Sequence, residues 1–330
     1  MVLLTKNQHR WGFACGRVSV LEGRLMPLDF FVSLVALERP EDLLHRLQDT
    51  PLRESLIPGA ATWEDWSTIV DTYVYRHVIE VRRNSPDPAL TDLFLLAQDY
   101  LNLKRAVLNA GSYPFLSGVF SEERLAEVAG GNSALLPQDL RRALASLSTS
   151  SAGEGGAFLT DVVLDGAYLR HMMDLAAKLD VPHITACVDL MVLARAVVVA
   201  WRAIRAGQSV RFYQQHFLPL GKHTGVMTGL LASADPQAWG AMLPVALADP
   251  LVQAQQEYDE EQVIRFKQLA ANAVTRMARH AKLQTMGPER VFGFLWGLLV
   301  EAYNFKLVIR GRLNRIDAEM LKRRLRECYV

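Results

Sequence analysis

Two pairs of metal-ligating side chains recur along the chain at the same spacing. His77 is followed three residues later by Glu80, and His171 is followed at the same distance by Asp174. Residues three apart share one face of a helix, and carboxylate–histidine pairs build di-iron centres in four-helix bundles. Those centres use the order Glu-x-x-His and need two further inward carboxylates. We therefore favour solvated or interhelical side-chain pairs, and a helical metalloenzyme is the alternative.

Other signatures of catalysis are missing from the sequence. It contains no Walker loop, no nucleophile elbow and no His-Glu-x-x-His zinc motif. The glycine-rich stretch 153–156 lacks the Lys and the Ser or Thr of a phosphate-binding loop. Cys15, Cys187 and Cys328 stand far apart, which fits a reducing compartment and argues against a metal knuckle or a disulfide framework. We expect no catalytic residues, no cofactor and no bound metal.

The charge of the chain is nearly balanced. Its 330 residues include 36 Lys and Arg against 35 Asp and Glu, so it lacks the basic excess of a dedicated nucleic-acid binder. Two local runs stand out. The acidic run 257–261 is either a contact patch or a helix start, and the second interpretation is favoured. The basic run 322–324, with Arg326, is either a contact for an acidic partner or a solvated helix face, and the helix face is again favoured.

The elements that would position these side chains carry a repeat. Three stretches start with an acid, followed by an apolar stripe of helical period and later by a glycine. The first copy runs from Asp99 to Leu108, the second from Asp189 to Val198 and the third from Glu301 to Arg310. The glycines are Gly111, Gly207 and Gly311. Repeats of this kind indicate stacked helical units.

The repeated polar positions are predicted to be structural. The middle copy has Val192 where the other two have Asn, so no chemistry can require that Asn three times. The motif residues are Asp99, Asn102, Lys104, Asp189, Arg195, Glu301, Asn304 and Lys306. A second repeated element precedes the first two copies, led by Asp71 and by Asp165, and Asp259 takes the similar place before the third.

Helical patterns dominate the chain, and alternating β patterns are missing. The expected helices cover residues 13–25, 41–48, about 62–83, 161–179, 185–206, 259–282 and 288–310, with others opening after Ser121, at Pro137 and at Asp317. Residues 146–156 read as a flexible loop, and no run is long and uninterrupted enough to span a bilayer. We predict an all-α fold of three units, about 1–111, 112–207 and 208–330. The first and last helices are free to pack together.

Two passages resemble a known family. The start, from Trp11 to Met26, is similar to the opening helix of the C subunits of prokaryotic V-type (A-type) ATPases, whose eukaryotic relative is the d subunit of V-ATPases. The end, from Glu301 to Val330, is similar to that family's closing Glu-x-x-Asn-Leu-(Arg/Lys)-x-Ile-x-x-Gly-Lys segment and final short helix. Residues 99–104 match the family's internal copy, whereas Trp11 stands where Tyr is more usual.

The resemblance implies a role in a rotary motor. Members of that family form a funnel of three similar helical bundles around a pseudo-threefold axis. The funnel sits on the cytoplasmic face of the proteolipid ring as a peripheral component and receives the tip of the central shaft. It has no catalytic residues and no cofactor, and it passes ring rotation to the ATP-hydrolysing or ATP-making head. The resemblance therefore implies a non-enzymatic component that couples the two parts of the motor.

Overall fold

The computed structural model describes residues 8–330 except 38, 109–114, 116–117, 130–131, 133–135, 151–155 and 234. Within these residues every regular element is an α-helix or a 3-10 turn, and no strand occurs. This confirms the predicted all-α fold class. The chain divides into two compact units, one made of residues 1–91 with 253–330 and the other of residues 92–252. The division into three repeats stays a prediction.

Six long helices make up nearly half of the described chain. They are α4 (Trp63–Asn84), α5 (Ala89–Val107), α8 (Gly156–Leu179), α9 (Pro182–Arg205), α13 (Asp259–Arg279) and α14 (Pro288–Leu313). The shorter helices are α1 (Gly12–Glu22), α2 (Leu28–Val35), α3 (Pro40–Gln48), α6 (Glu122–Ala129), α7 (Gln138–Ser150), α10 (Val210–His216), α11 (Thr224–Ala232), α12 (Val245–Gln255) and α15 (Ala318–Arg324). The 3-10 turns are η1 (Gln8–Trp11), η2 (Pro51–Ser55), η3 (Gly221–His223), η4 (Pro236–Met242) and η5 (His280–Leu283).

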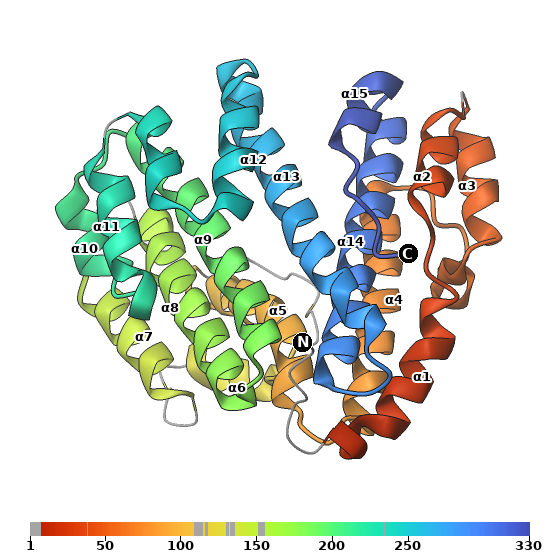
Figure 1. Ribbon diagram of the computed structural model, residues 1–330, viewed down its shortest axis with the longest axis horizontal. Coiled ribbons are helices and arrows are strands. Elements are labelled where there is room, and N and C mark those ends of the chain that lie inside the picture. The colour runs from red at the N-terminus through yellow and green to blue at the C-terminus, as the bar shows by residue number, and fades with distance from the viewer. Residues whose placement is uncertain are drawn as a thin grey trace. The chain divides into compact units, whose positions relative to one another are not determined.

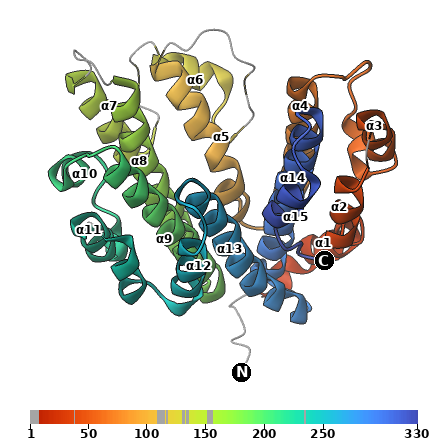
Figure 2. The ribbon, with the colours of Figure 1, turned by 90° about the horizontal axis from the view of Figure 1, so that it is seen from above.

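In the first unit, helices from the N-terminal part of the chain pack against helices from its C-terminal part. Helix α14, near the C-terminus, runs beside α4 and also contacts α1, α2 and α13 (Figure 1). The ring of Phe31 on α2 meets that of Phe305 on α14 edge to face, with centroids 4.9 Å apart. In the second unit α8 lies between α7 and α9, with α10 against α8 and α11 against α9 (Figure 2).

Helix starts follow the capping signals of the sequence. Thr62 accepts a hydrogen bond from the amide of Asp65, and the Asp65 carboxylate accepts one from the amide of Thr62, which forms a capping box at the start of α4. The Asp317 side chain accepts from the amide of Met320 and caps α15. Helices α9 and α14 both begin on a proline. Proline has no N–H, and at the first position of a helix the N–H would have no partner within the helix. Local signals therefore set where these helices begin.

Several helix boundaries differ from the sequence-based expectation: α8 begins at Gly156 and not at residue 161, and α9 begins at Pro182 and not at residue 185. Two further differences have a packing reason. Helix α7 continues through Ser150, where a loop over 146–156 was expected, because its apolar face, including Leu140 and Leu147, is buried. Gly311 does not end its stretch but lies inside α14, since packing against the buried Leu321 of α15 excludes a side chain there. Gly207 follows the end of α9 with a φ of +60°, as a terminating glycine does. Gly111 lies outside the described residues.

Helices α9 and α14 are long and apolar enough to span a membrane by length and composition. The apolar runs within them were expected to be too short or too interrupted, but the helices reach 24 and 26 residues. Most residues of both helices are buried inside the protein, as they are in the central helix of a bundle. Their apolar character is therefore accounted for by the core.

Candidate functional site

The first histidine–carboxylate pair has protein partners. His77 on α4 is 5% exposed, and its Nδ1 lies 2.9 Å from the carbonyl oxygen of Tyr73. Burial lowers the pKa of His77, which keeps the imidazole neutral. Glu80 forms an ion pair with Arg17 of α1. The Glu80–Arg17 ion pair joins α4 to α1 within the first unit, whereas the His77 contact lies within α4.

The second pair lies on α8, in the other unit. The His171 ring packs edge-on to the Tyr100 ring, with centroids 6.2 Å apart. Among the residues that the structure describes, no group of three or more His, Cys, Asp or Glu side chains is placed to hold a metal ion. In that part of the chain the metalloenzyme alternative has no ligand set.

The acid that opens the first copy holds a loop. Asp99 on α5 is fully buried, and its carboxylate accepts hydrogen bonds from the amides of Val119, at 2.9 Å, and Phe120, at 3.0 Å. Burial raises the pKa of Asp99 to about 6, and the hydrogen bonds from the two backbone amides oppose that rise. The two amides come just before α6. Asp99 therefore fixes the approach to that helix.

The acid of the second copy makes an equivalent contact with side-chain donors. Asp189 on α9 accepts from Lys222 Nζ at 2.6 Å and lies 2.8 Å from His223 Nε2. His223 is the N-cap residue of α11. Asp189 therefore holds the segment that leads into α11.

The acid of the third copy is the most enclosed. Glu301 on α14 is 2% exposed, and it accepts from the Met26 amide at 2.7 Å and from the Tyr73 hydroxyl at 3.0 Å. Burial raises its pKa to about 8, although both hydrogen bonds lower it. Met26 precedes Pro27, the N-cap residue of α2. In all three copies the acid thus binds the residues directly before a short helix.

The basic residues of the repeat bind the acids of the second repeated element. Lys104 Nζ lies 2.8 Å from Asp165 Oδ1, and Lys306 Nζ lies 2.6 Å from Asp71 Oδ1. Arg195 Nη2 reaches the other oxygen of Asp165 at 3.1 Å. The lysine of the first copy therefore pairs with the acid that precedes the second, and the lysine of the third pairs with the acid that precedes the first.

A hollow of about 380 Å³ adjoins the ion pair in the second unit. Its walls combine the charged side chains of Lys104, Asp165 and Arg195 with the rings of Tyr100 and Tyr168. Both cations face Asp165, and Lys104 Nζ also lies 2.8 Å from Asp161 Oδ1, so two cations face two carboxylates here. These ion pairs join α5 and α9 to α8.

The two Asn positions of the repeat are both buried. Asn304 donates from Nδ2 to the Arg326 carbonyl at 3.0 Å and accepts at Oδ1 from the Arg326 amide at 2.9 Å. Asn102, at the same offset in the first copy, is 7% exposed. Asn304 thus binds the non-helical end of the chain, residues 325–330, which we name the C-terminal strap.

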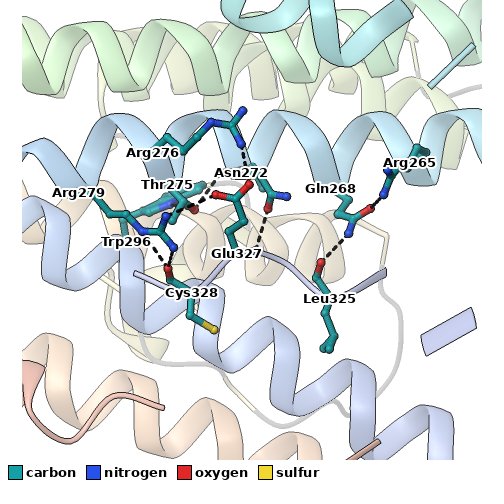
Figure 3. Close-up of polar contacts among 11 residues, drawn as sticks. Arg265, Gln268, Asn272, Thr275, Arg276, Arg279, Trp296, Leu325, Glu327 and Cys328 are labelled. Atoms are coloured by element: carbon teal, nitrogen blue, oxygen red, sulfur yellow. Dashed lines mark hydrogen bonds and ion pairs between the residues drawn. The ribbon is translucent and has the colours of Figure 1, made fainter. Parts of the chain in front are cut away.

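The residues of α13 that hold the C-terminal strap were not predicted from the sequence. Gln268 donates to the Leu325 carbonyl at 2.5 Å, Asn272 accepts from the Glu327 amide at 2.9 Å, and Arg279 donates to the Cys328 carbonyl (Figure 3). These three side chains lie four and seven residues apart, which places them along one face of the helix. The signal that could have revealed them is the helical spacing of the polar residues at positions 268, 272 and 279 in the sequence.

Two arginines of the basic run pair with two glutamates of the acidic run. Arg323 Nη2 lies 2.8 Å and 2.9 Å from the carboxylate oxygens of Glu257, and Arg324 Nη2 lies 2.6 Å from Glu261 Oε1. Arg326 stacks on Tyr303, with its guanidinium carbon 3.5 Å from the ring centroid. The favoured interpretation of the basic run, a solvated helix face, is therefore wrong for Arg324 and Arg326. A hollow of about 350 Å³ lies between the two runs.

A match to a protein family extends over most of the chain. The family model for the ATP synthase (C/AC39) subunit matches residues 14–324, nearly the whole chain. The matched range contains all three acid-led helices and the ion pairs that join α5 to α8 and α14 to α4. No curated protein sequence gives a significant match. On the length of the family match, this chain belongs to the family of ATP synthase (C/AC39) subunits.

Proposed function

We propose that this chain is the non-catalytic component of a rotary V/A-type ATPase that joins the central shaft to the membrane proteolipid ring. It sits at the cytoplasmic face of the membrane and meets the lipid phase only through the ring. There it couples ATP turnover to ion transport. The observation that carries this proposal is the family match over residues 14–324.

We also propose that three helical repeats build the protein as a pseudo-threefold funnel. Two sets of contacts support this arrangement. Asp99, Asp189 and Glu301 each bind the residues before a short helix. The Lys104–Asp165 and Lys306–Asp71 ion pairs join equivalent positions of different copies, and the second of them links the third copy to the element that precedes the first.

The internal chemistry of the chain suits a mechanical joint. The motif acids and bases bind backbone amides and opposite charges of the same chain, so they hold segments in place and have no role in turning over a substrate. A joint that transmits torque needs an extensive contact, and we expect its combined interfaces to bury ~2,000 Å² or more.

The test is deletion of the gene followed by separate assays of the head and of the membranes. ATP hydrolysis by the detached head is expected to persist, while ATP-driven ion pumping is lost and returns when the chain is restored. A chain truncated before Glu301 is not expected to restore pumping, because the third copy loses its helix. Membranes that lack the chain and pump at the normal rate per ATP would refute the coupling role.

Assembly is tested separately by purifying the membrane complex through a tagged copy of this chain. The shaft and proteolipid proteins are expected to co-purify in fixed proportion. As a control for a change in the C-terminal part of the chain, a full-length Glu319→Gln variant alters only an exposed acid that pairs with Lys322 one turn away. That variant is expected to assemble and pump like the unaltered chain. Recovery of the tagged chain without any shaft protein would contradict the proposal.

A further inference from the structure

We propose that the groove between α13 and α14 is a binding site for an extended peptide, with the C-terminal strap as its resident ligand. The strap leaves α15 after Arg324 and runs without helical structure to the end of the chain. Figure 3 shows it lying along α13, with side chains of that helix directed at its backbone. The strap is therefore bound as a ligand would be bound.

The groove recognises the peptide backbone. An extended segment leaves its amide and carbonyl groups unpaired unless neighbouring groups bind them. Asn304 bonds both the amide and the carbonyl of Arg326, as a residue of an adjacent antiparallel strand would. Gln268 and Asn272 bond the Leu325 carbonyl and the Glu327 amide on the other side. Side-chain amides thus stand in for a partner strand.

The groove also contains a socket for an aromatic side chain. Tyr329 is 1% exposed and lies against two glycines of α14. A Cβ on Gly293 would stand 2.7 Å from the Tyr329 hydroxyl, and one on Gly297 would stand 2.5 Å from the Tyr329 Cβ. Lys282 Nζ lies 4.5 Å from the centroid of the ring. The Tyr329 ring can lie this close to α14 because Gly293 and Gly297 have no side chains.

Two polar contacts add sequence preference. The Tyr329 hydroxyl lies 3.2 Å from Glu22 of α1, and Glu327 Oε1 lies 2.6 Å from Arg276 of α13. The chemical class of the ligand is therefore an extended peptide with an acidic residue followed two positions later by a phenolic one. Because Glu22 belongs to α1, the bound peptide also ties the beginning of the chain to α13 and α14.

The tether makes this site self-occupied. A ligand joined to its site by a short covalent link binds at a high effective concentration, so free peptides compete poorly while the strap is attached. Removal of the strap leaves the same groove open to the same peptide added in solution. That the strap would hold α1, α13 and α14 together under torque rests on the proposed function. Peptide binding by the isolated chain does not rest on it.

The experiment uses the chain truncated after Arg324 and a fluorescent synthetic peptide with the sequence of residues 325–330. Saturable binding is expected, together with a rise in the melting temperature of the truncated chain. The peptide with Ala in place of Tyr329 is expected to bind at least about tenfold weaker, a loss of about 1.4 kcal/mol. Asn304→Ala in the truncated chain is expected to weaken binding similarly, whereas Glu260→Ala, on the exposed first turn of α13, leaves it unchanged.

A second measurement uses the full-length chain, in case the truncated chain does not fold. In a Tyr329→Ala variant, the amides of Arg326 and Glu327 are expected to exchange hydrogen at least tenfold faster, while those of central α9 stay protected. A folded truncated chain that does not bind the peptide would overturn the proposal. So would a Tyr329→Ala variant that keeps full protection of both amides. Neither measurement involves the ATPase. A negative result would therefore overturn the peptide-binding proposal and leave the proposed coupling role untouched.

Discussion

Lys306 on α14 places its ammonium nitrogen 2.6 Å from the carboxylate of Asp71 on α4, 235 residues earlier in the chain. The Lys104–Asp165 contact repeats this relationship at 2.8 Å within the other compact unit. The equivalence is one of chemistry and of position, because each lysine lies five residues after the acid of its copy. The first of these ion pairs fastens the C-terminal part of the chain to its N-terminal part.

A double-mutant cycle tests the contribution of that ion pair. The side chains of Lys306 and Asp71 are 29% and 26% exposed, so water screens their attraction only in part. We expect Lys306→Ala and Asp71→Ala to show a coupling free energy of about 1 kcal/mol in chemical denaturation. The control pair Lys322–Glu319 is more exposed, at 35% and 75%, and should couple by less than about 0.5 kcal/mol. Equal coupling in both cycles would contradict the prediction.

Glu301→Gln is expected to flatten the pH dependence of stability. The folded-state pKa of Glu301, about 8, lies above its ordinary value of 4.5 because of burial. Between these two values the folded chain binds more protons than the unfolded chain, so the free energy of unfolding falls as pH rises. Below about pH 4.5 this loss is absent, and above about pH 8 it is complete.

The measurement is the free energy of unfolding of both chains between pH 5 and 9. The Gln side chain can still accept from the Met26 amide and donate to Tyr73, so the variant is expected to keep the fold. Its free energy of unfolding should no longer show the fall with pH that Glu301 causes. Relative to the unaltered chain it should gain on the order of a few kcal/mol at pH 8–9. Asp99 contributes a slope of the same sign near its own pKa of about 6, which the comparison subtracts. Parallel pH curves for the two chains would sink the idea.

Two glycine substitutions are expected to change stability in opposite directions. Gly311→Ala places a methyl group against Leu321, which is fully buried, so overpacking should cost about 1–3 kcal/mol. Gly16→Ala lies on the exposed side of α1 with nothing within 4 Å of the new carbon, so helix propensity should stabilise it by up to about 1 kcal/mol. Urea denaturation of both variants measures the difference, and a neutral Gly311→Ala would mean that the contact between α14 and α15 is loose.

Elemental analysis tests the metal alternative. The purified chain is expected to hold no stoichiometric iron or manganese, and His77→Ala and His171→Ala are expected to leave its metal content unchanged. His77→Ala should nevertheless lower the melting temperature, because it leaves a cavity beside Tyr73, whose ring centroid lies 4.6 Å from that of His77. Stoichiometric metal that disappears in both variants would revive the metalloenzyme interpretation.

Local pattern was enough to predict the helical fold. Periodic apolar residues and capping side chains such as Thr62 and Asp317 act within one or two turns, so their effect is legible in the sequence. The repeated acids were also visible because they recur in phase with the apolar stripe. Two local signals were ambiguous. Helix α7 continues to Ser150 because its apolar face is buried, and α14 continues past Gly311, which packs against α15.

Only the tertiary structure decided which distant residues form hydrogen bonds and ion pairs with one another. Glu301 takes its hydrogen bonds from Met26, 275 residues away, and from Tyr73, 228 residues away. No periodicity relates such residues, because a single donor and acceptor need only meet in space. For the same reason the acidic run 257–261 and the basic run 322–324 looked like two surface features until the fold brought them together. The C-terminal strap has no helical period at all, and its conformation exists because Gln268, Asn272 and Asn304 supply the hydrogen bonds that its own backbone cannot make.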